Sequence, residues 1–331
     1  MNRAIVVATD GRAEAAGALR VAQALAQRDG RPVVVLSVLE PLALYGALSP
    51  DVASDDRAEA EAGSRGALRA RVEAQLAAVA GGPAAGWEVH QGVGRTAPTI
   101  ASFAHEQHAA LIVLGHAPRH GVERWVAGET AVRVMQMAHV PVLAVPPEAQ
   151  ALPRRALVAV DFSEFSRQAA LWALGLLEPD GELHLAHALS LPVDPLSGAL
   201  GSDWLAATRA SAHKQLDELC AALRGSRRVH VQPHLRLGDA AATLLDLADE
   251  LGIELLAAGS HGRGFFGRLL LGSTSTRLAR AARCAVLVVP PPTLPEELRQ
   301  VPRDEYEPPA AEPPSDEAVG NYPPSHEPLR R

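Results

Sequence analysis

The stretch HVPVLAVPP (residues 139–147) returns as RCAVLVVPP (residues 283–291), an offset of 144 residues between positions 139 and 283. The halves also begin alike, because AIVVATD (residues 4–10) corresponds to ALVAVDF (residues 156–162) and places Asp10 opposite Asp161. This agreement indicates two copies of one structural unit. Carried backward without a gap, the offset aligns five further pairs: Gly94 with Gly238, Gly115 with Gly259, Arg119 with Arg263, Arg124 with Arg268 and Gly128 with Gly272.

The repeat divides the 331 residues into three expected parts: a domain at 1–150, a second domain at 151–292 and a tail at 293–331. In each half, short strands rich in Val and Leu alternate with amphipathic helical patterns. That alternation is typical of βαβ units and of a parallel sheet that is covered on both faces. We therefore expect an α/β fold with two tandem doubly wound, Rossmann-like domains, each built on an open parallel five-stranded sheet.

The expected tail differs from both domains in composition. Residues 293–331 hold nine of the 26 prolines, many acidic residues and no apolar periodicity. This composition predicts a disordered, partly polyproline segment, because it offers too little apolar surface for a packed core. A segment that binds a protein partner is the alternative for the same residues.

Composition also limits the classes of partner. The formal net charge of -7 and an isoelectric point near 6.0 argue against a broad surface for nucleic acid or anionic lipid. Two cysteines, Cys220 and Cys284, are too few for a disulfide framework. The chain starts with a strand pattern rather than a signal peptide, and no apolar run approaches the roughly 20 residues that cross a bilayer. We expect a cytoplasmic protein that contacts neither nucleic acid nor membrane.

A glycine-rich loop, GSHGRGFFGRLLLGST (residues 259–274), follows the strand pattern ELLAAG and leads into the helical pattern STSTRLARAA. In an open parallel sheet, ligands bind beyond the carboxyl ends of the strands, where this loop begins. Glycines let a ligand approach the backbone closely, and the N-terminus of the following helix favours a phosphate group. Ser273 and Thr274 stand where a hydroxyl can donate to a phosphate oxygen. The loop therefore predicts phosphate binding.

Two other phosphate-binding motifs fit this loop less well. GRGFFG (residues 262–267) has the GxGxxG spacing of the dinucleotide fingerprint, but that motif belongs to the first strand-to-helix turn and needs an acidic residue about 20 positions on. A P-loop needs a lysine, and the only lysine, Lys214, lies on a different helical pattern. Phosphates here would be held by backbone N–H groups, hydroxyls and arginines.

A third pattern, GxxG followed by nine residues and G[ST], is filled by Gly259, Gly262, Gly272 and Ser273. Together with Asp161 at a strand end and the closing AVLVVPP, it makes residues 156–291 resemble the ATP-binding branch of the universal stress protein family. The first half is similar to the same domain in degraded form. The whole chain therefore resembles the tandem universal stress proteins of bacteria.

The resemblance implies that the second half binds ATP, with Mg²⁺, across its strand ends. Matching positions assign Asp161 and the backbone of Ala159 and Ala188 to adenine and ribose. The phosphate side takes the residues at and after the later strand end: Ala258, Gly259, Gly262, Gly272, Ser273 and Thr274. Arg263 and Arg268 are added as phosphate partners because of their charge. The resemblance also implies edge-to-edge pairing of the last strands, PVLAVPP and AVLVVPP, as an intramolecular pseudo-dimer, and the same strands are candidates for pairing two chains as a homodimer.

The first half departs from the pattern at two aligned positions, where Pro118 replaces the second glycine and Glu129 replaces the serine. Proline removes a backbone N–H donor, and the carboxylate of Glu129 would lie beside a phosphate. Two like charges about 4 Å apart repel by about 4 kcal/mol at an effective dielectric constant near 20. We therefore expect the first half to lack tight ATP binding and to have a structural role.

Histidines invite metal-site hypotheses, but the pairs His116/His120 and His184/His187 lack a further ligand at metal-binding spacing. We therefore predict no metal site. On a strand, the spacing of His184 and His187 places them on opposite faces. His187 ends its strand near the expected adenine edge and is a candidate lining residue. His261 lies inside the glycine-rich loop, where it either contacts phosphate or faces solvent.

Other polar residues near the loop also have two interpretations. Asp161 can cap the helix that follows it, as Ser163 also can, and this role does not exclude contact with the ribose. We interpret Arg277 and Arg280, on the helix beyond the loop, as solvated residues.

Three functions from different classes remain. The intact GxxGx9GS pattern favours a nucleotide-binding regulator of stress response or signalling with an unknown protein partner. An interaction protein that uses no nucleotide would rely on the first half and the tail. An adenylating enzyme of a related fold would carry an SGGxDS or HxGH signature, and the sequence has neither, nor an obvious nucleophile paired with a base beside the loop. We therefore predict binding without catalysis.

Overall fold

The computed structural model describes residues 3–41, 54–80, 87–116, 129–190, 202–224, 229–261 and 271–290. The expected tail (293–331), Pro118 and three residues of the expected site, Gly262, Arg263 and Arg268, lie outside the described residues. The predictions made for these residues stay predictions.

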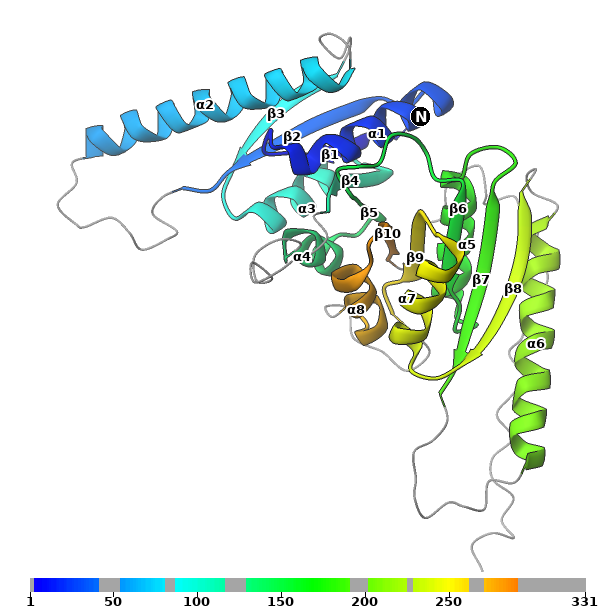
Figure 1. Ribbon diagram of the computed structural model, residues 1–331. Coiled ribbons are helices and arrows are strands. Elements are labelled where there is room, and N and C mark those ends of the chain that lie inside the picture. Colours follow the sequence, from blue (N-terminus) through cyan, green and yellow to red (C-terminus); the bar gives the residue numbers. More distant parts are fainter. Residues whose placement is uncertain are drawn as a thin grey trace, which may run out of the picture.

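Both halves alternate strands and helices in the expected order (Figure 1). The first half consists of β1 (Ile5–Ala8), a short 3₁₀ helix (Ala13–Ala15), α1 (Ala16–Asp29), β2 (Val33–Leu39), α2 (Ser54–Ala80), β3 (Glu88–Val93), α3 (Thr96–Glu106), β4 (Leu111–Gly115), α4 (Glu129–Met137) and β5 (Val142–Val145). The second half consists of β6 (Arg155–Ala159), α5 (Glu164–Leu176), β7 (Glu182–Leu189), α6 (Ser202–Arg224), β8 (His230–Leu237), α7 (Ala240–Leu251), β9 (Leu255–Gly259), α8 (Ser273–Ala281) and β10 (Ala285–Val289).

The strands form one ten-stranded sheet in the order β3-β2-β1-β4-β5-β10-β9-β6-β7-β8. Neighbouring strands within each half run parallel, whereas β5 and β10 pair antiparallel. The strand order changes direction between β1 and β4 and again between β6 and β9. Such switch points are where open α/β sheets bind ligands. The expected fold class, two tandem doubly wound α/β domains, is confirmed.

A pseudo-twofold axis passes between the two last strands. Leu143 pairs with Leu287, and these two positions differ by the 144-residue offset of the repeat. The bounds of α4 and α8, and those of β4 and β9, differ by the same offset. The flanking residues pair in the same symmetrical register, Val142 with Val288 and Ala144 with Val286.

The last strands therefore pair within the chain, as expected for a pseudo-dimer. Pairing of two chains through the edges of these same strands does not fit this arrangement. β5 has β4 and β10 as neighbours, and β10 has β5 and β9, so neither strand keeps a free edge.

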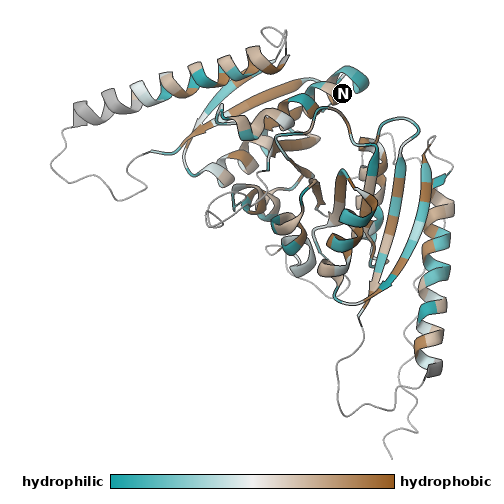
Figure 2. Cartoon of the chain, viewed as in Figure 1, coloured by the Kyte–Doolittle hydropathy of each residue, from teal (hydrophilic) through white to brown (hydrophobic). Residues whose placement is uncertain are grey.

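The apolar strands explain why helices cover both faces of the sheet. Nearly every residue of β1, β4, β5, β9 and β10 is buried, and Figure 2 shows these hydrophobic strands at the centre of the molecule. Successive side chains point to opposite faces, so Val6 and Val7 belong to different core clusters. One cluster lies against α1, α2, α5 and α6, and the other lies against α3, α4, α7 and α8.

The two halves meet along a seam, defined as the β5–β10 junction with the helices on each side of it. On one face of the seam, α4 packs against α8. Glu129 at the start of α4 pairs with Arg280 of α8 at 3.4 Å. Arg280 is exposed, as expected of a solvated residue, and this surface ion pair is an additional contact. His116 Nε2 lies 3.2 Å from the carbonyl oxygen of Ala282 and donates to it, because a carbonyl only accepts.

On the other face of the seam, two arginines of α1 hold backbone carbonyls of the second half and of the linking segment. Arg20 donates to the carbonyl of Ala149 at 2.8 Å. Arg28 donates to the carbonyl of Gly175 at 2.7 Å, at the C-terminal end of α5, where a cation is favourable. The halves are thus joined through the sheet and through both of its faces.

Candidate functional site

A cavity of about 600 Å³ lies at the carboxyl edge of the second half's sheet, at the switch point between β6 and β9. Its size falls within the roughly 300–1,000 Å³ typical of ligand pockets. The structure brings together every predicted site residue that it describes. Eight of the eleven line this cavity: Ala159, Asp161, Ala188, Ala258, Gly259, Gly272, Ser273 and Thr274.

The cavity wall between β7 and α7 contains residues that the sequence analysis missed. Ala186, Ala240 and Leu244 give this wall small apolar side chains, which suit the face of a planar ring. Ala240 and Leu244 stand four residues apart on α7, and that spacing places two side chains on one helix face. The spacing was readable in the sequence, but the position of α7 over the end of β7 was not.

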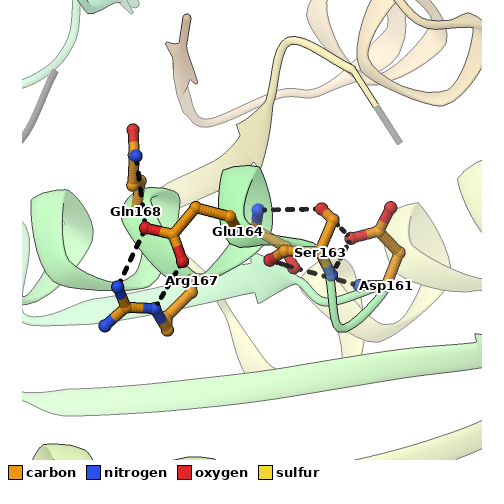
Figure 3. Close-up of polar contacts among 6 residues, drawn as sticks. Asp161, Ser163, Glu164, Arg167 and Gln168 are labelled. Carbon is orange, nitrogen blue, oxygen red and sulfur yellow. Dashed lines mark hydrogen bonds and ion pairs between the residues drawn. The ribbon is translucent and has the colours of Figure 1, made fainter. Parts of the chain in front are cut away.

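Asp161 lies on the turn that joins β6 to α5 (Figure 3). Its Oδ1 accepts from the backbone N–H of Ser163 at 3.0 Å, while the Ser163 hydroxyl accepts from the N–H of Ser166 at 3.3 Å. Ser163 is therefore the N-cap of α5, and the interpretation of Asp161 as the cap is wrong. Phe162 between them has a φ of 62°, in the left-handed region, which bends the chain sharply at this point.

The first turn of α5 has its own set of polar contacts, also visible in Figure 3. Arg167 donates from Nε and Nη2 to the two carboxylate oxygens of Glu164, each at 2.8 Å. Gln168 donates to the same carboxylate at 3.3 Å. An acidic residue is favourable at a helix N-terminus. Glu164, which is held in place by Arg167 and Gln168, therefore stabilises the start of α5, the helix that follows Asp161.

His187 closes the cavity at the end of β7. Its Nδ1 lies 2.6 Å from the carbonyl oxygen of Val160, so Nδ1 carries the proton of this hydrogen bond. The imidazole also packs against Phe162, with ring centroids 4.5 Å apart. The expected place of His187 on the cavity wall agrees with the structure.

His184, three residues earlier on β7, is not among the lining residues and is buried in a separate pair. Its Nδ1 lies 2.9 Å from His234 Nε2. Burial lowers the pKa of His184, and burial together with the neighbouring His184 lowers the pKa of His234 to about 4. Within the described ranges, no group of three or more His, Cys, Asp or Glu side chains is arranged to hold a metal ion.

The opposite end of the cavity is formed by the start of α8. Gly272 is the N-cap residue, no side chain caps the first turn, and that turn contains no acidic residue. The first N–H groups of a helix lack partners within the helix and carry a partial positive charge. Ser273 and Thr274 present this end to the cavity. Further along α8, Arg277 is exposed, as expected of a solvated residue, and pairs at the surface with Asp239 at 2.8 Å.

Two hydrogen bonds tie the start of α8 to the end of β9. The Ser275 hydroxyl donates to the carbonyl of Gly259 at 2.6 Å, and the N–H of Gly272 donates to the carbonyl of Ser260 at 2.7 Å. Gly259 lines the cavity and also has a packing role. A Cβ at this position would lie 2.7 Å from Cβ and 2.9 Å from the carbonyl carbon of Phe165. Glycine is therefore required by the packing of α5 against β9.

The first half carries a carboxylate at each of the two corresponding helix starts. Glu129 begins α4, and its carboxylate pairs with Arg133 at 2.8 Å and with Arg280 at 3.4 Å. Glu40, which follows β2, accepts from the backbone N–H of Thr96 at 2.8 Å, at the start of α3. Asp239 likewise caps α7 in the second half, so the two halves differ in charge only at the start of α4, where Glu129 corresponds to Ser273.

The fold and this cavity define a class of protein: a tandem, doubly wound α/β protein with a ligand-sized cavity at the switch point of its second half. Comparison with known proteins gives the family. The model of the universal stress protein family matches both halves, at residues 1–146 and 153–290. The chain belongs to the universal stress protein family. Along the parts of the chain that the structure covers, no helix has both the length and the apolar content that a membrane span requires.

Among the individual relatives, one matches across both halves of the chain and another matches about a third of it. A universal stress protein of Mycolicibacterium smegmatis is 26% identical over 293 residues, which are 87% of this chain and 97% of the relative. Universal stress protein A homolog 2 of Coxiella burnetii is 33% identical over 117 residues, covering 33% of this chain and 75% of the relative. The crystal structure of a universal stress protein from Archaeoglobus fulgidus has a TM-score of 0.59 at 21% identity, covering 88% of this chain and 99% of that one. This structural likeness shows the fold.

Proposed function

We propose that this protein is a nucleotide-binding regulator of stress responses whose second half binds one molecule of ATP, with Mg²⁺, while its first half binds none. The observation that carries the proposal is the meeting of all eight described site residues in one cavity of about 600 Å³. The GxxGx9GS pattern at residues 259–273 selects an adenine nucleotide as the ligand through its resemblance to the ATP-binding branch of the family.

The two ends of the cavity differ in chemistry in the way a nucleotide requires. The wall formed by Ala186, Ala240 and Leu244 offers an apolar surface for the base. Asp161 offers a carboxylate, which only accepts hydrogen bonds when it is ionised and so suits the hydroxyls of a ribose. The uncapped start of α8 offers N–H groups and a partial positive charge for the phosphates.

Mg²⁺ fits this site mainly as a partner of the phosphates. Asp161 is the only acidic side chain among the described residues that line the cavity. Mg²⁺ in nucleotide sites is commonly held by phosphate oxygens and water with one or two carboxylates. The predicted contributions of Gly262, Arg263 and Arg268 would add further groups to the phosphate end.

The arrangement favours binding over catalysis. Ser260 Oγ lies 2.9 Å from His261 Nδ1, the distance expected of a nucleophile and its base. Ser260 is 3% exposed, however, and is not among the lining residues of the cavity, so its hydroxyl cannot meet a ligand there. We therefore assign the second half a binding role.

The test is thermal unfolding of the full chain with Mg-ATP, Mg-GTP or no nucleotide. A ligand at about 100 times its Kd that binds only the folded state adds about 2.7 kcal/mol to the free energy of unfolding. Mg-ATP should therefore raise the Tm by several degrees, and Mg-GTP at equal concentration should raise it less. No stabilisation by either nucleotide would contradict the proposal and favour an interaction protein that does not use nucleotide.

A further inference from the structure

A second cavity, of about 350 Å³, lies at the seam on the face that α1 and α5 cover, and we call it the seam cavity. Among the described residues, it shares no lining residue with the cavity at the start of α8. Both halves supply its apolar walls, with side chains that belong to one core cluster: Val21, Leu143 and Val145 from the first half and Leu176, Leu255 and Ala285 from the second. The chain therefore has a second, separate space of the size of a ligand pocket.

This space exists because the two faces of the seam are built differently. On one face the counterpart helices α4 and α8 pack directly against each other, whereas α1 and α5, the counterparts on the other face, pack together less closely. Residues 148–154 of the linking segment form the remaining wall. Protein interiors are close-packed and rarely hold a void larger than a water molecule. A space of about 350 Å³ between core side chains is therefore too large for a packing defect, and ligand pockets often lie between domains.

The polar groups of the seam cavity favour a cation. Among the described lining residues, two carboxylates, those of Glu148 and Glu254, accompany a single guanidinium, that of Arg154. Oε2 of Glu254 accepts from the backbone N–H of Arg154 at 2.6 Å and of Arg155 at 3.4 Å, which fixes this carboxylate at the cavity wall. Arg20 of α1, which is not a lining residue, donates instead to backbone carbonyls of the linking segment.

We propose that the seam cavity binds a small organic amine, with the apolar body of the amine between the two halves and its ammonium group on the carboxylate of Glu254. An ammonium group has three donors and no acceptor, so it is complementary to a carboxylate. Leu143 and Leu255 cover the apolar body from the two halves. A ligand held in this way contacts both halves and strengthens the joint between them. This inference is independent of the proposed nucleotide binding.

The test uses three probes that share one apolar body and differ in the head group: phenylbutylamine, phenylbutanol and phenylbutyrate. In calorimetric titrations of the full-length chain, the amine should bind at least about tenfold more tightly than the other two, because only its head group forms a charge-assisted hydrogen bond with Glu254. Glu254→Gln keeps an acceptor for the two backbone N–H groups and removes the charge. This variant should lower the affinity for the amine to that for the alcohol.

Two further measurements locate the bound amine. Ala149→Phe adds a phenyl ring at a lining position and should abolish binding of all three probes without lowering the Tm of the free chain. Saturating Mg-ATP should not displace the amine, because the two cavities are separate. The matched control is Glu106→Gln, at an exposed position of α3 on the opposite face of the sheet, which should leave the affinity for the amine unchanged.

Several outcomes would overturn the proposal. The wild-type chain might bind none of the probes, or bind the amine and the carboxylate equally well. Undiminished binding of the amine by Glu254→Gln would remove the carboxylate from the site. Displacement of the amine by Mg-ATP, or undiminished binding by Ala149→Phe, would place the amine outside the seam cavity.

Discussion

Leu143 of β5 and Leu287 of β10 are counterparts in the two halves and pair with each other across the seam. Both side chains are buried, at 2% and 0% exposed, and both belong to one core cluster that runs through the two halves. When two domains share an apolar core, the unfolding of one domain exposes the core residues of the other. We therefore expect the two halves to unfold as one cooperative unit.

Leu287→Ala tests this shared core. Removing a buried leucine side chain lowers the free energy of unfolding by about 2–5 kcal/mol. Urea unfolding, followed by circular dichroism and by tryptophan fluorescence, should show one transition that shifts to lower urea. Leu237→Ala on the edge strand β8, where the side chain is 42% exposed, should change the free energy by less than about 0.5 kcal/mol. Two separate transitions in the wild-type chain would contradict the shared core.

Gly259→Ala should destabilise the fold and weaken nucleotide binding together. The added Cβ would lie 2.7 Å from Cβ of Phe165 and 2.9 Å from its backbone, and overpacking of this kind costs about 1–3 kcal/mol. Gly63→Ala is the control, because a Cβ there meets nothing within 4 Å, and alanine in a helix interior is favoured by about 0.5–1 kcal/mol. Equal stabilities of the Gly259→Ala and wild-type chains would refute the packing role of this glycine.

The buried histidine pair predicts a stability that falls in mild acid. The folded-state pKa of His234 is lowered to about 4 from 6.5, so between these values the unfolded chain binds more protons. The contribution of neutral, buried His234 to the free energy of unfolding is complete above pH 6.5 and is lost as the pH falls toward 4. Charged neighbours do not reverse the shift: Glu182 and Glu250 raise the two pKa values, but burial outweighs them.

His234→Gln should therefore flatten the dependence of the free energy of unfolding on pH between 6.5 and 4. His213→Gln, at an exposed position of α6, should leave the slope as it is in the wild-type chain. The measurement is urea unfolding at half-unit steps of pH. A His234→Gln chain with the wild-type slope would show that this pair does not set the acid sensitivity.

The sequence was informative wherever the signal is a repeat or a local pattern. The 144-residue offset predicted corresponding elements, and the bounds of α4 and α8 follow it residue for residue. The glycine-rich loop and Asp161 predicted a site at the strand ends, and the predicted site residues that the structure describes line one cavity. Repeats and strand-end motifs can be recognised in a sequence because they depend only on the order of residues along the chain.

Contacts between distant segments were not readable in the same way. Glu129 was recognised as a residue unfavourable to phosphate, and its pairing with Arg133 was available from the four-residue spacing. Its second partner, Arg280, is 151 residues away and meets it only because the last strands pair. Gly259 looked like a ligand-approach glycine, yet the neighbour that requires it, Phe165, comes from another element.

The central claim is that one chain holds one nucleotide, at the start of α8. The most direct measurement is a calorimetric titration with Mg-ATP of the wild-type chain, of Ser273→Glu, which copies the first half, and of Glu129→Ser, which copies the second. We predict one site in the wild-type chain and one in Glu129→Ser. Ser273→Glu should lose about a hundredfold or more in affinity, because its carboxylate would face a phosphate, while keeping the circular dichroism spectrum of the wild type. Two equivalent sites per wild-type chain, or undiminished binding by Ser273→Glu, would contradict the account.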